Sequence, residues 1–289
     1  MKQRLMSFVS FLLLIFSIES LMFLSGTGRH AAHAEEKAYT IGVVPQFEQR
    51  KLYAIWKPIV EDLEQRTGIK FNLNSTLTIE AFEKAIERGD FDFVYMNPYH
   101  IVQVHARQGY IPLVADRVAL RGIIVVQKDS AIQSPAELND ELVAFPSPNA
   151  IGATLLPKSD LGQLFQTTVE PLYVKTHSSV YLHVVKGLAA AGGGVEKTLQ
   201  EQSEEIRNAL RIIYTTRSFT SHPVAAHPRV PAEIREKVRT AFLSMNDSPE
   251  AMAMLRDVPV ERFIPVTYDD YAVMSSWGLE KYWQPVSGD

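Results

Sequence analysis

Short apolar runs alternate with amphipathic segments along most of the chain after residue 38. The apolar runs are typical of buried parallel strands, which we expect at residues 39–44, 70–73, 91–95, 111–115, 120–127, 142–145, 172–175 and 211–215. Between them, apolar residues recur at helical spacing, which predicts helices at 52–66, 79–88, 98–108, 151–165, 179–191, 196–209 and 231–245. Strands that alternate with helices of this length indicate an α/β fold with mostly parallel sheets flanked by helices.

The order of these elements predicts two lobes, with a return of the chain to the first lobe. The first lobe is expected to comprise residues 35–120 and 218–289, and the second lobe residues 121–217. The crossing strands would lie near 116–126 and 212–224. Such a two-strand hinge lets the lobes close over a ligand, so the sequence predicts a two-lobed clamp.

Three consecutive glycines, Gly192 to Gly194, follow the helix expected at 179–191. They lack the Lys and the Ser or Thr of a phosphate-binding loop, and no strand is expected directly before them. We therefore interpret them as the end of that helix. The charged helix expected at 196–209 is interpreted as a solvated surface helix.

The first 34 residues have the pattern of a cleavable secretion signal. Lys2 and Arg4 precede an apolar stretch at 8–24, and Ala32-His33-Ala34 fits the small-x-small cleavage pattern. We expect cleavage after Ala34, and the alternative is an uncleaved membrane anchor. No other stretch of the sequence reaches the roughly 18 apolar residues of a spanning helix, so we expect the mature chain in the periplasm.

The charge and the lack of cysteine exclude several classes of function. The chain has 29 Lys and Arg against 33 Asp and Glu; without Lys2, Arg4, Arg29 and Glu19 of the signal, 26 and 32 remain, a net charge of −6. This charge argues against binding of nucleic acid, which depends on cationic contacts to phosphate. With no cysteine, the chain has no disulfide, thiolate metal site or cysteine nucleophile, and no cysteine that could carry a lipid.

The sequence also gives little support for catalysis or for a metal site. It contains no Gly-x-Ser-x-Gly motif and no evident nucleophile–base pair. His100 and His105 are five positions apart, whereas a helical metal-binding pair prefers three or four. We therefore expect neither an enzyme nor a bound metal or cofactor.

The stretch 91–100, Phe-Asp-Phe-Val-Tyr-Met-Asn-Pro-Tyr-His, combines a buried strand with aromatic and amide groups at its end. Ligands of open α/β sheets bind outside the carboxyl ends of the strands, so this end is a candidate ligand-binding wall. The alternative is an ordinary loop in which Asn97 caps the next helix and Pro98 takes its first position. Other residues expected near the same cleft follow the first strand, namely Gln46, Phe47 and Tyr53.

Six groups of residues occur in an order and at spacings that one protein family shares. They are Gly42-Val43-Val44-Pro45; Trp56-Lys57-Pro58 with Leu63-Glu64 and Gly68; Asp92-Phe93-Val94-Tyr95; Pro148-Asn149; Thr176-His177; and Pro223-Val224. Over nearly the whole mature chain, the sequence resembles the periplasmic solute-binding proteins for phosphonate, phosphate and phosphite uptake. The resemblance implies a type II two-lobed periplasmic-binding fold with a small ligand in the cleft. It also implies an ABC transporter or a sensor kinase as the partner.

The resemblance implies roles for individual residues as well. Tyr95 matches the tyrosine at the end of the third strand, and His177 matches a histidine that begins a second-lobe helix. The family often has Ser-Thr-Ser after Pro148-Asn149, but Ala150-Ile151-Gly152 occupies these positions here. The family's acidic ligand contact is likewise replaced by alanines and glycines near 189–194.

These departures predict a ligand other than a simple phosphonate. A hydrogen bond to a charged group contributes roughly 1.5–3 kcal/mol, so the loss of two or three hydroxyls would weaken oxyanion binding by orders of magnitude. The free amides of the helices that begin near 151 and 178 still favour an anion. The candidate ligand-binding residues are Tyr95, Asn97, Tyr99, Gln46, Phe47, Tyr53, Asn149, Gly152, His177 and Ser178.

The function expected from the sequence is capture of a small oxyanion or related solute for an ABC transporter. The protein would be a monomer. The first alternative is a ligand-sensing partner of a sensor kinase, and an enzyme on the same fold is the least favoured reading. Ser221-His222, on the segment that returns to the first lobe, is interpreted as hinge or surface.

Overall fold

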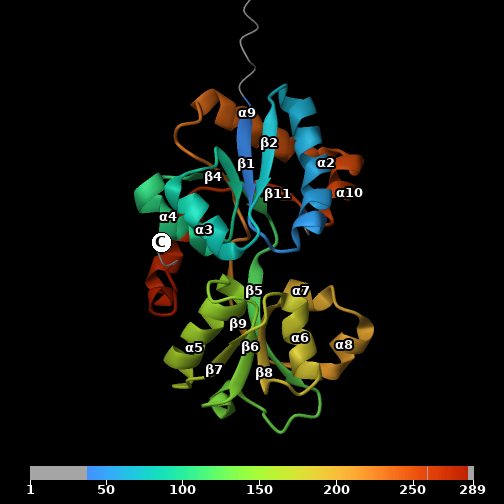
Figure 1. The fold of residues 1–289 in the computed structure, drawn as a ribbon, viewed down its shortest axis with the longest axis vertical. Helices are drawn as coiled ribbons and strands as arrows, with labels where there is room; N and C mark the ends of the chain where they lie inside the picture. The colour runs from blue at the N-terminus through green and yellow to red at the C-terminus, as the bar shows by residue number, and fades with distance from the viewer. Residues whose placement is uncertain (1–37, 259, 286–289) are drawn as a thin grey trace, which may run out of the picture. The chain divides into compact units, whose positions relative to one another are not determined.

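The strands form two mixed β-sheets, each flanked by helices (Figure 1). The computed structural model describes residues 38–258 and 260–285, so the expected secretion signal lies outside the described residues. The first sheet has the order β11-β4-β10-β3-β1-β2, with β1 Tyr39–Val43, β2 Phe71–Ser75, β3 Phe93–Tyr95, β4 Ile111–Asp116, β10 Val224–Ala226 and β11 Phe263–Pro265. The second has the order β7-β6-β8-β5-β9, with β5 Leu120–Gln127, β6 Leu142–Phe145, β7 Glu170–Tyr173, β8 Ala191–Val195 and β9 Leu210–Phe219.

The helices divide between the two sheets. Those of the first lobe, the first sheet with its helices, are α2 Gln49–Thr67, α3 Ile79–Arg88, α4 Pro98–Gln108, α9 Ala232–Ser244, α10 Pro249–Leu255 and α11 Asp269–Ala272. Those of the second lobe, the second sheet with its helices, are α5 Leu156–Leu164, α6 His177–Val185, α7 Glu196–Gln200 and α8 Glu204–Ala209. A π-helical turn, η2 Ile151–Leu155, leads directly into α5. Among the described residues, no helix is long and apolar enough to span a bilayer.

The α/β class and the two-lobed arrangement expected from the sequence are confirmed, but the sheets are not mostly parallel. β1 pairs in parallel with β2 and β3, and β6 pairs in parallel with β7 and β8. The chain crosses from the first sheet to the second between β4 and β5, and it returns between β9 and β10. The strands around these crossings pair antiparallel, β10 with β3 and β4, and β5 with β8 and β9. The proposed division into 35–120 with 218–289 and 121–217 separates the two sheets except at Leu120, the first residue of β5, and at 218–219, the end of β9.

Local sequence signals account for the first-lobe helices. α2, α3 and α4 each end at a glycine in the left-handed conformation, at Gly68, Gly89 and Gly109. Asn97 caps α4 by accepting a hydrogen bond from the Tyr99 amide at 3.0 Å, and Pro98 takes the first helical position.

The prediction for the glycine run was wrong, because Gly192 to Gly194 lie within the buried central strand β8. A Cβ on Gly193 would overlap the Ala153 carbonyl oxygen, and a Cβ on Gly194 would overlap the Tyr181 hydroxyl. Close approach of η2 and α6 to the strand therefore requires glycine here. The expected helix at 179–191 ends at Val185, and the expected helix at 196–209 is two short helices, α7 and α8.

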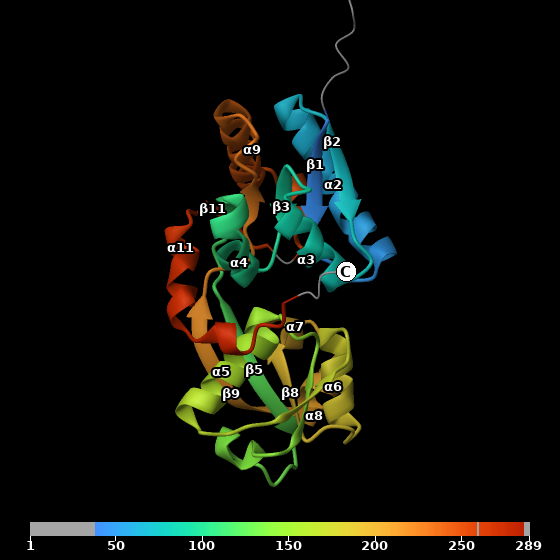
Figure 2. The ribbon, with the colours of Figure 1, turned by 60° about the vertical axis from the view of Figure 1, so that its left-hand side comes forward.

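The C-terminal segment, which includes the 3₁₀ turns η4 Val273–Ser276 and η5 Leu279–Lys281, contacts both lobes (Figure 2). The Ser159 hydroxyl of α5 donates a hydrogen bond to the Trp277 carbonyl oxygen at 2.9 Å. The Trp283 ring packs edge to face on Tyr99 and His100 of α4, with centroid distances of 5.6 and 5.8 Å. The segment thus ties α5 of the second lobe to α4 of the first.

Candidate functional site: a cleft between the lobes

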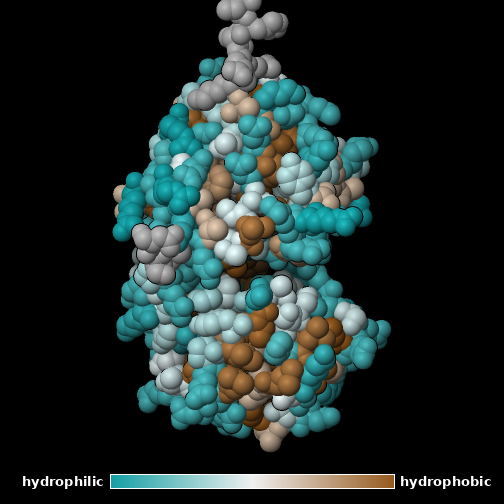
Figure 3. All heavy atoms as spheres, in the orientation of Figure 1, coloured by the Kyte–Doolittle hydropathy of each residue, from teal (hydrophilic) through white to brown (hydrophobic). Residues whose placement is uncertain are grey.

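A cavity of about 540 Å³ lies between the lobes, and a hollow is visible there in the space-filling view (Figure 3). The first lobe contributes the residues that follow β1 and β3, which are the carboxyl ends of parallel strands. The second lobe contributes Pro146, Ser147 and residues 149–153, together with the residues at the start of α6 and those of α7. The segment that joins β9 to β10 lines the cavity between them. This position agrees with the general rule for ligand sites in open α/β sheets.

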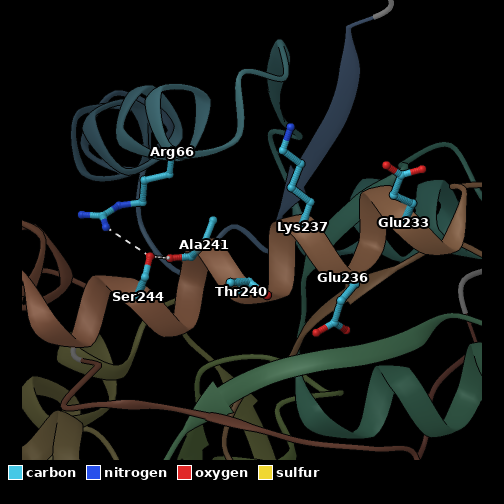
Figure 4. A pocket seen from close by; sticks show the side chains of 7 residues that line it. All are labelled: Arg66, Glu233, Glu236, Lys237, Thr240, Ala241 and Ser244. Atoms are coloured by element: carbon cyan, nitrogen blue, oxygen red, sulfur yellow. Dashed lines mark hydrogen bonds between the residues drawn. The ribbon is translucent and has the colours of Figure 1, made fainter.

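A second hollow lies on the first lobe, between α2 and α9 (Figure 4). Arg66 in this hollow donates hydrogen bonds to Asp62 Oδ2 at 2.6 Å and to Ser244 Oγ at 3.1 Å, so its charge is already balanced. None of the residues predicted to bind ligand lines this hollow. The cleft between the lobes is therefore the candidate site.

The structure brings eight of the ten predicted residues to the cleft: Gln46, Phe47, Tyr95, Asn97, Asn149, Gly152, His177 and Ser178. It does not bring Tyr53 or Tyr99 there. The Tyr53 side chain is on the outer part of α2 and is 46% exposed. Tyr99 is buried against Trp283, because the turn of α4 after Asn97 directs it towards the C-terminal segment.

Tyr95 forms the floor of the first-lobe side of the cleft. Its ring lies between Trp56 of α2, at a centroid distance of 4.8 Å, and His222, at 5.4 Å. Burial, with a smaller contribution from the charge of Asp116, raises the pKa of Tyr95 above its ordinary value. The side chain is therefore a neutral phenol that can donate a hydrogen bond.

His177 is the first residue of α6, and the helix start orients it towards the cleft. The Thr176 hydroxyl oxygen caps the helix by accepting a hydrogen bond from the Ser179 amide at 3.1 Å. Burial lowers the pKa of His177 to about 4, so its imidazole is neutral near pH 7. Ser178 lines the cavity beside it, and the positive end of the α6 dipole favours an anion there.

Lining residues that the sequence prediction missed come from α7 and from the segment that returns to the first lobe. Lys197, Thr198 and Glu201 of α7 line the cavity, although this part of the chain was interpreted as a solvated helix. His222 also lines it, although it was interpreted as hinge or surface. The position of α7 directly after β8 was the available signal, but the glycine run was not recognised as a strand.

The turn at Ala150 to Gly152 lines the cleft without hydroxyl groups, as the sequence indicates. Other hydroxyls are present: Ser147, Ser178 and Thr198 all line the same cavity. The Ser147 hydroxyl oxygen is buried and has no hydrogen-bond partner among the described residues. A buried polar atom of this kind is stabilised by a hydrogen bond from a ligand or a water molecule.

Asn149 lines the cleft, but its side chain also joins the two lobes. Its amide nitrogen donates to both carboxylate oxygens of Glu83 in α3, at 3.1 and 3.0 Å, and to the Gln284 carbonyl oxygen at 2.9 Å. Its amide oxygen accepts from the Gln284 amide at 3.0 Å. His100 is 3.0 Å from the same Glu83 carboxylate, and the side chains of both residues are buried. These bonds give Asn149 a structural role that the sequence prediction did not include.

The charged groups at the cleft nearly balance one another. Lys51, Lys175 and Lys197 line it, against Glu48 and Glu201. Lys197 also donates to Asp116 Oδ2 across the lobes at 3.2 Å. Within the described residues, no group of three or more His, Asp or Glu side chains has the geometry of a metal site. The arrangement suits a small anion held by hydrogen bonds.

Comparison with known proteins agrees with this geometry. The family model described as ABC transporter, phosphonate, periplasmic substrate-binding protein matches residues 41–271. The phosphonates-binding periplasmic protein of Escherichia coli (strain K12) is 22% identical over 254 residues, which cover 81% of this chain and 74% of that protein.

Solved structures show the same fold. PhnD1 of Prochlorococcus marinus (MIT 9301) in complex with methylphosphonate has a TM-score of 0.75 at 14% identity, covering 85% of this chain and 98% of that one. A Xanthomonas citri protein bound to ATP has a TM-score of 0.72 at 16% identity, with the same coverage. Because the family model matches well over half of the chain, this protein belongs to the periplasmic substrate-binding proteins of phosphonate ABC transporters, which are binding proteins and not enzymes.

Proposed function

We propose that the protein captures a small oxyanionic solute in the cleft between its lobes and delivers it to the permease of an ABC transporter. The observation that carries the proposal is the meeting of two helix starts, at Ile151 and His177, with the Tyr95 phenol around one cavity. The backbone amides at the start of a helix favour an anion at such a point. The names of the relatives support a phosphoryl or phosphonyl group, since they mention phosphonates, methylphosphonate and ATP.

We further propose that the ligand is larger than a simple phosphonate. The first turn of η2 offers no hydroxyl to the anion, and the cavity of about 540 Å³ is far larger than methylphosphonate needs. A water molecule takes about 30 Å³ in the liquid, so this cavity has room for an organic group attached to the anion. The apolar lining residues Phe47, Phe219 and Val260 suit such a group.

Isothermal titration of the mature protein tests this proposal. Phosphate, phosphite and methylphosphonate should bind more weakly than micromolar, which corresponds to less than about 8 kcal/mol of binding free energy. Native mass spectrometry of freshly purified protein should show a bound phosphoryl compound of higher mass. Micromolar binding of any of the three simple anions would contradict the size argument.

The partner defines a second candidate function. We retain the proposal that the liganded form contacts a sensor kinase instead of a permease, since the same closed cleft serves either partner. Genes for a permease and an ATPase beside this gene support transport, and genes for a kinase and a response regulator support signalling.

Cleavage after Ala34 and a monomeric mature form complete the proposal. N-terminal sequencing tests the cleavage site, and light scattering tests the monomeric state.

A further inference from the structure

His222 occupies a fixed position in the wall of the cleft. It lies on the segment between β9 and β10, and its ring stacks on Tyr95 with an interplanar angle of 21°. The backbone on both sides is anchored: the Met96 amide donates to the Pro223 carbonyl oxygen at 3.2 Å, and the Tyr271 hydroxyl donates to the Ser221 carbonyl oxygen at 3.0 Å. The imidazole is therefore a preorganised part of the cavity.

The hydrogen bond to Gln46 assigns the tautomer of His222. The Gln46 side-chain nitrogen is 3.1 Å from Nε2 of the imidazole. An amide nitrogen only donates, so Nε2 accepts and the neutral ring carries its proton on Nδ1. Within the described part of the chain, no group accepts a hydrogen bond from this Nδ1–H. The ring thus has one donor left for a ligand.

The surroundings of His222 disfavour positive charge. Burial lowers the pKa of His222 to about 3, and the charges of His100, His177 and Lys197 act in the same direction. These groups come from α4, α6 and α7, and the stacked Tyr95 from β3 is an uncharged phenol. Desolvation is the largest of these causes, and it would also act on a ligand ammonium group placed here.

Resting on the proposed oxyanion function, we propose that His222 is a specificity-determining ligand contact. Its neutral imidazole donates the Nδ1–H to a ligand oxygen, and the wall formed by Tyr95 and His222 rejects ligands with an ammonium group at this position. The cleft therefore takes phosphoryl compounds with a neutral organic group in preference to aminoalkyl compounds of the same size.

Two phosphate esters with equal numbers of heavy atoms, propyl phosphate and phosphoethanolamine, test the selectivity by titration. The wild-type protein should bind propyl phosphate at least about 10-fold more tightly, since about 1.4 kcal/mol corresponds to a factor of ten. Equal affinity, or tighter binding of phosphoethanolamine, would overturn the inference. If neither these esters nor any other phosphoryl compound binds, the proposed oxyanion function itself is wrong.

A matched pair of variants tests whether the Nδ1–H of His222 donates a hydrogen bond to the ligand. His222→Asn keeps an N–H donor near the position of Nδ1, whereas His222→Gln keeps the acceptor for Gln46 and loses that donor. His222→Gln should weaken binding of propyl phosphate by about 10- to 100-fold, as expected for a hydrogen bond to a charged group, and His222→Asn by less than about 5-fold. The opposite ranking would overturn the inference, and thermal melting of both variants verifies that they fold.

The tautomer of His222 can be measured in the ligand-free protein. Nitrogen-15 NMR of histidine-labelled protein should show a protonated Nδ1 and an unprotonated Nε2 for His222. Gln46→Glu provides an acceptor in place of the donor and should move the proton to Nε2 with loss of propyl phosphate binding. A wild-type Nε2–H tautomer would overturn this inference and leave the proposed function intact.

Discussion

Two cleft histidines, His177 and His222, make the stability of the fold depend on pH. Burial lowers their pKa values to about 4 and about 3, whereas an unfolded histidine has its ordinary pKa of about 6.5. Below pH 6.5 the unfolded chain therefore binds more protons than the folded chain. The stability from these groups is fully present above pH 6.5 and is lost as pH falls towards 4 and 3, by up to about 1.4 kcal/mol per pH unit for each histidine.

Urea denaturation at pH 7.5, 6 and 5 checks this prediction. The double variant His177→Gln/His222→Gln should lose less free energy of unfolding between pH 7.5 and 5 than the wild type does. Carboxylates contribute equally to both proteins, so the difference between the two slopes isolates the histidines. Identical slopes would show that both imidazoles titrate normally in the folded protein.

The sequence predicted single residues well where a strand end and a helix start supply them. Tyr95 follows a clear apolar strand, and His177 begins a helix with a Thr cap, so both could be assigned to the cleft. His222 lies on a short connection with no periodic pattern, and only tertiary structure brings it onto Tyr95. Tyr99 was predicted to line the cleft but does not, because the rotation around the first turn of α4 decides which side chain reaches the cleft.

At the scale of elements, the strand β8 shows why a sequence pattern can fail. Strands are recognised by β-branched and aromatic residues, and β8 instead contains three glycines. Only glycine fits there because η2 and α6 approach the strand closely, and the residues of the strand itself give no sign of either contact. Because the glycine run was interpreted as the end of a helix, α7 was not recognised as a helix that follows a central strand. A helix in that position is expected at the ligand-binding edge of the sheet.

The substitution Gly193→Ala should therefore destabilise the second lobe. Its Cβ would overlap the Ala153 carbonyl oxygen and lie 2.6 Å from the Phe145 ring, and overpacking of this kind costs about 3 kcal/mol. Gly68→Ala is the control, since a Cβ there meets no atom within 4 Å and only the left-handed backbone costs about 1 kcal/mol. Chemical denaturation measures both, and a smaller loss for Gly193→Ala would contradict the packing argument.

In the whole molecule, polar contacts between the lobes connect parts of the chain that are far apart in sequence. Asn149 bonds to Glu83 of α3, and Lys197 bonds to Asp116 at the end of β4. The alternation of strands and helices predicted two lobes from local patterns alone. It contains no information about these pairs, which form only once both lobes are folded and face each other.

The Asn149–Glu83 contact should favour the arrangement in which the lobes face each other closely. Asn149→Ala removes both hydrogen bonds to a buried carboxylate, at a cost of about 1.5–3 kcal/mol. If Asn149 supports binding only by holding the two lobes together, this variant should bind propyl phosphate and phosphoethanolamine more weakly by the same factor, about 10- to 100-fold. Small-angle X-ray scattering of the ligand-free variant should also show a larger radius of gyration.

Asn139→Ala is the matched control for this last prediction. Asn139 donates a hydrogen bond to Asp140 and accepts one from the Thr168 amide, both within the second lobe, and it does not line the cavity. Its ligand affinities and radius of gyration should stay close to those of the wild type. If Asn149→Ala instead weakened only one ligand and left the radius unchanged, Asn149 would be a direct ligand contact, because a contact between lobes lowers the affinity for every ligand equally.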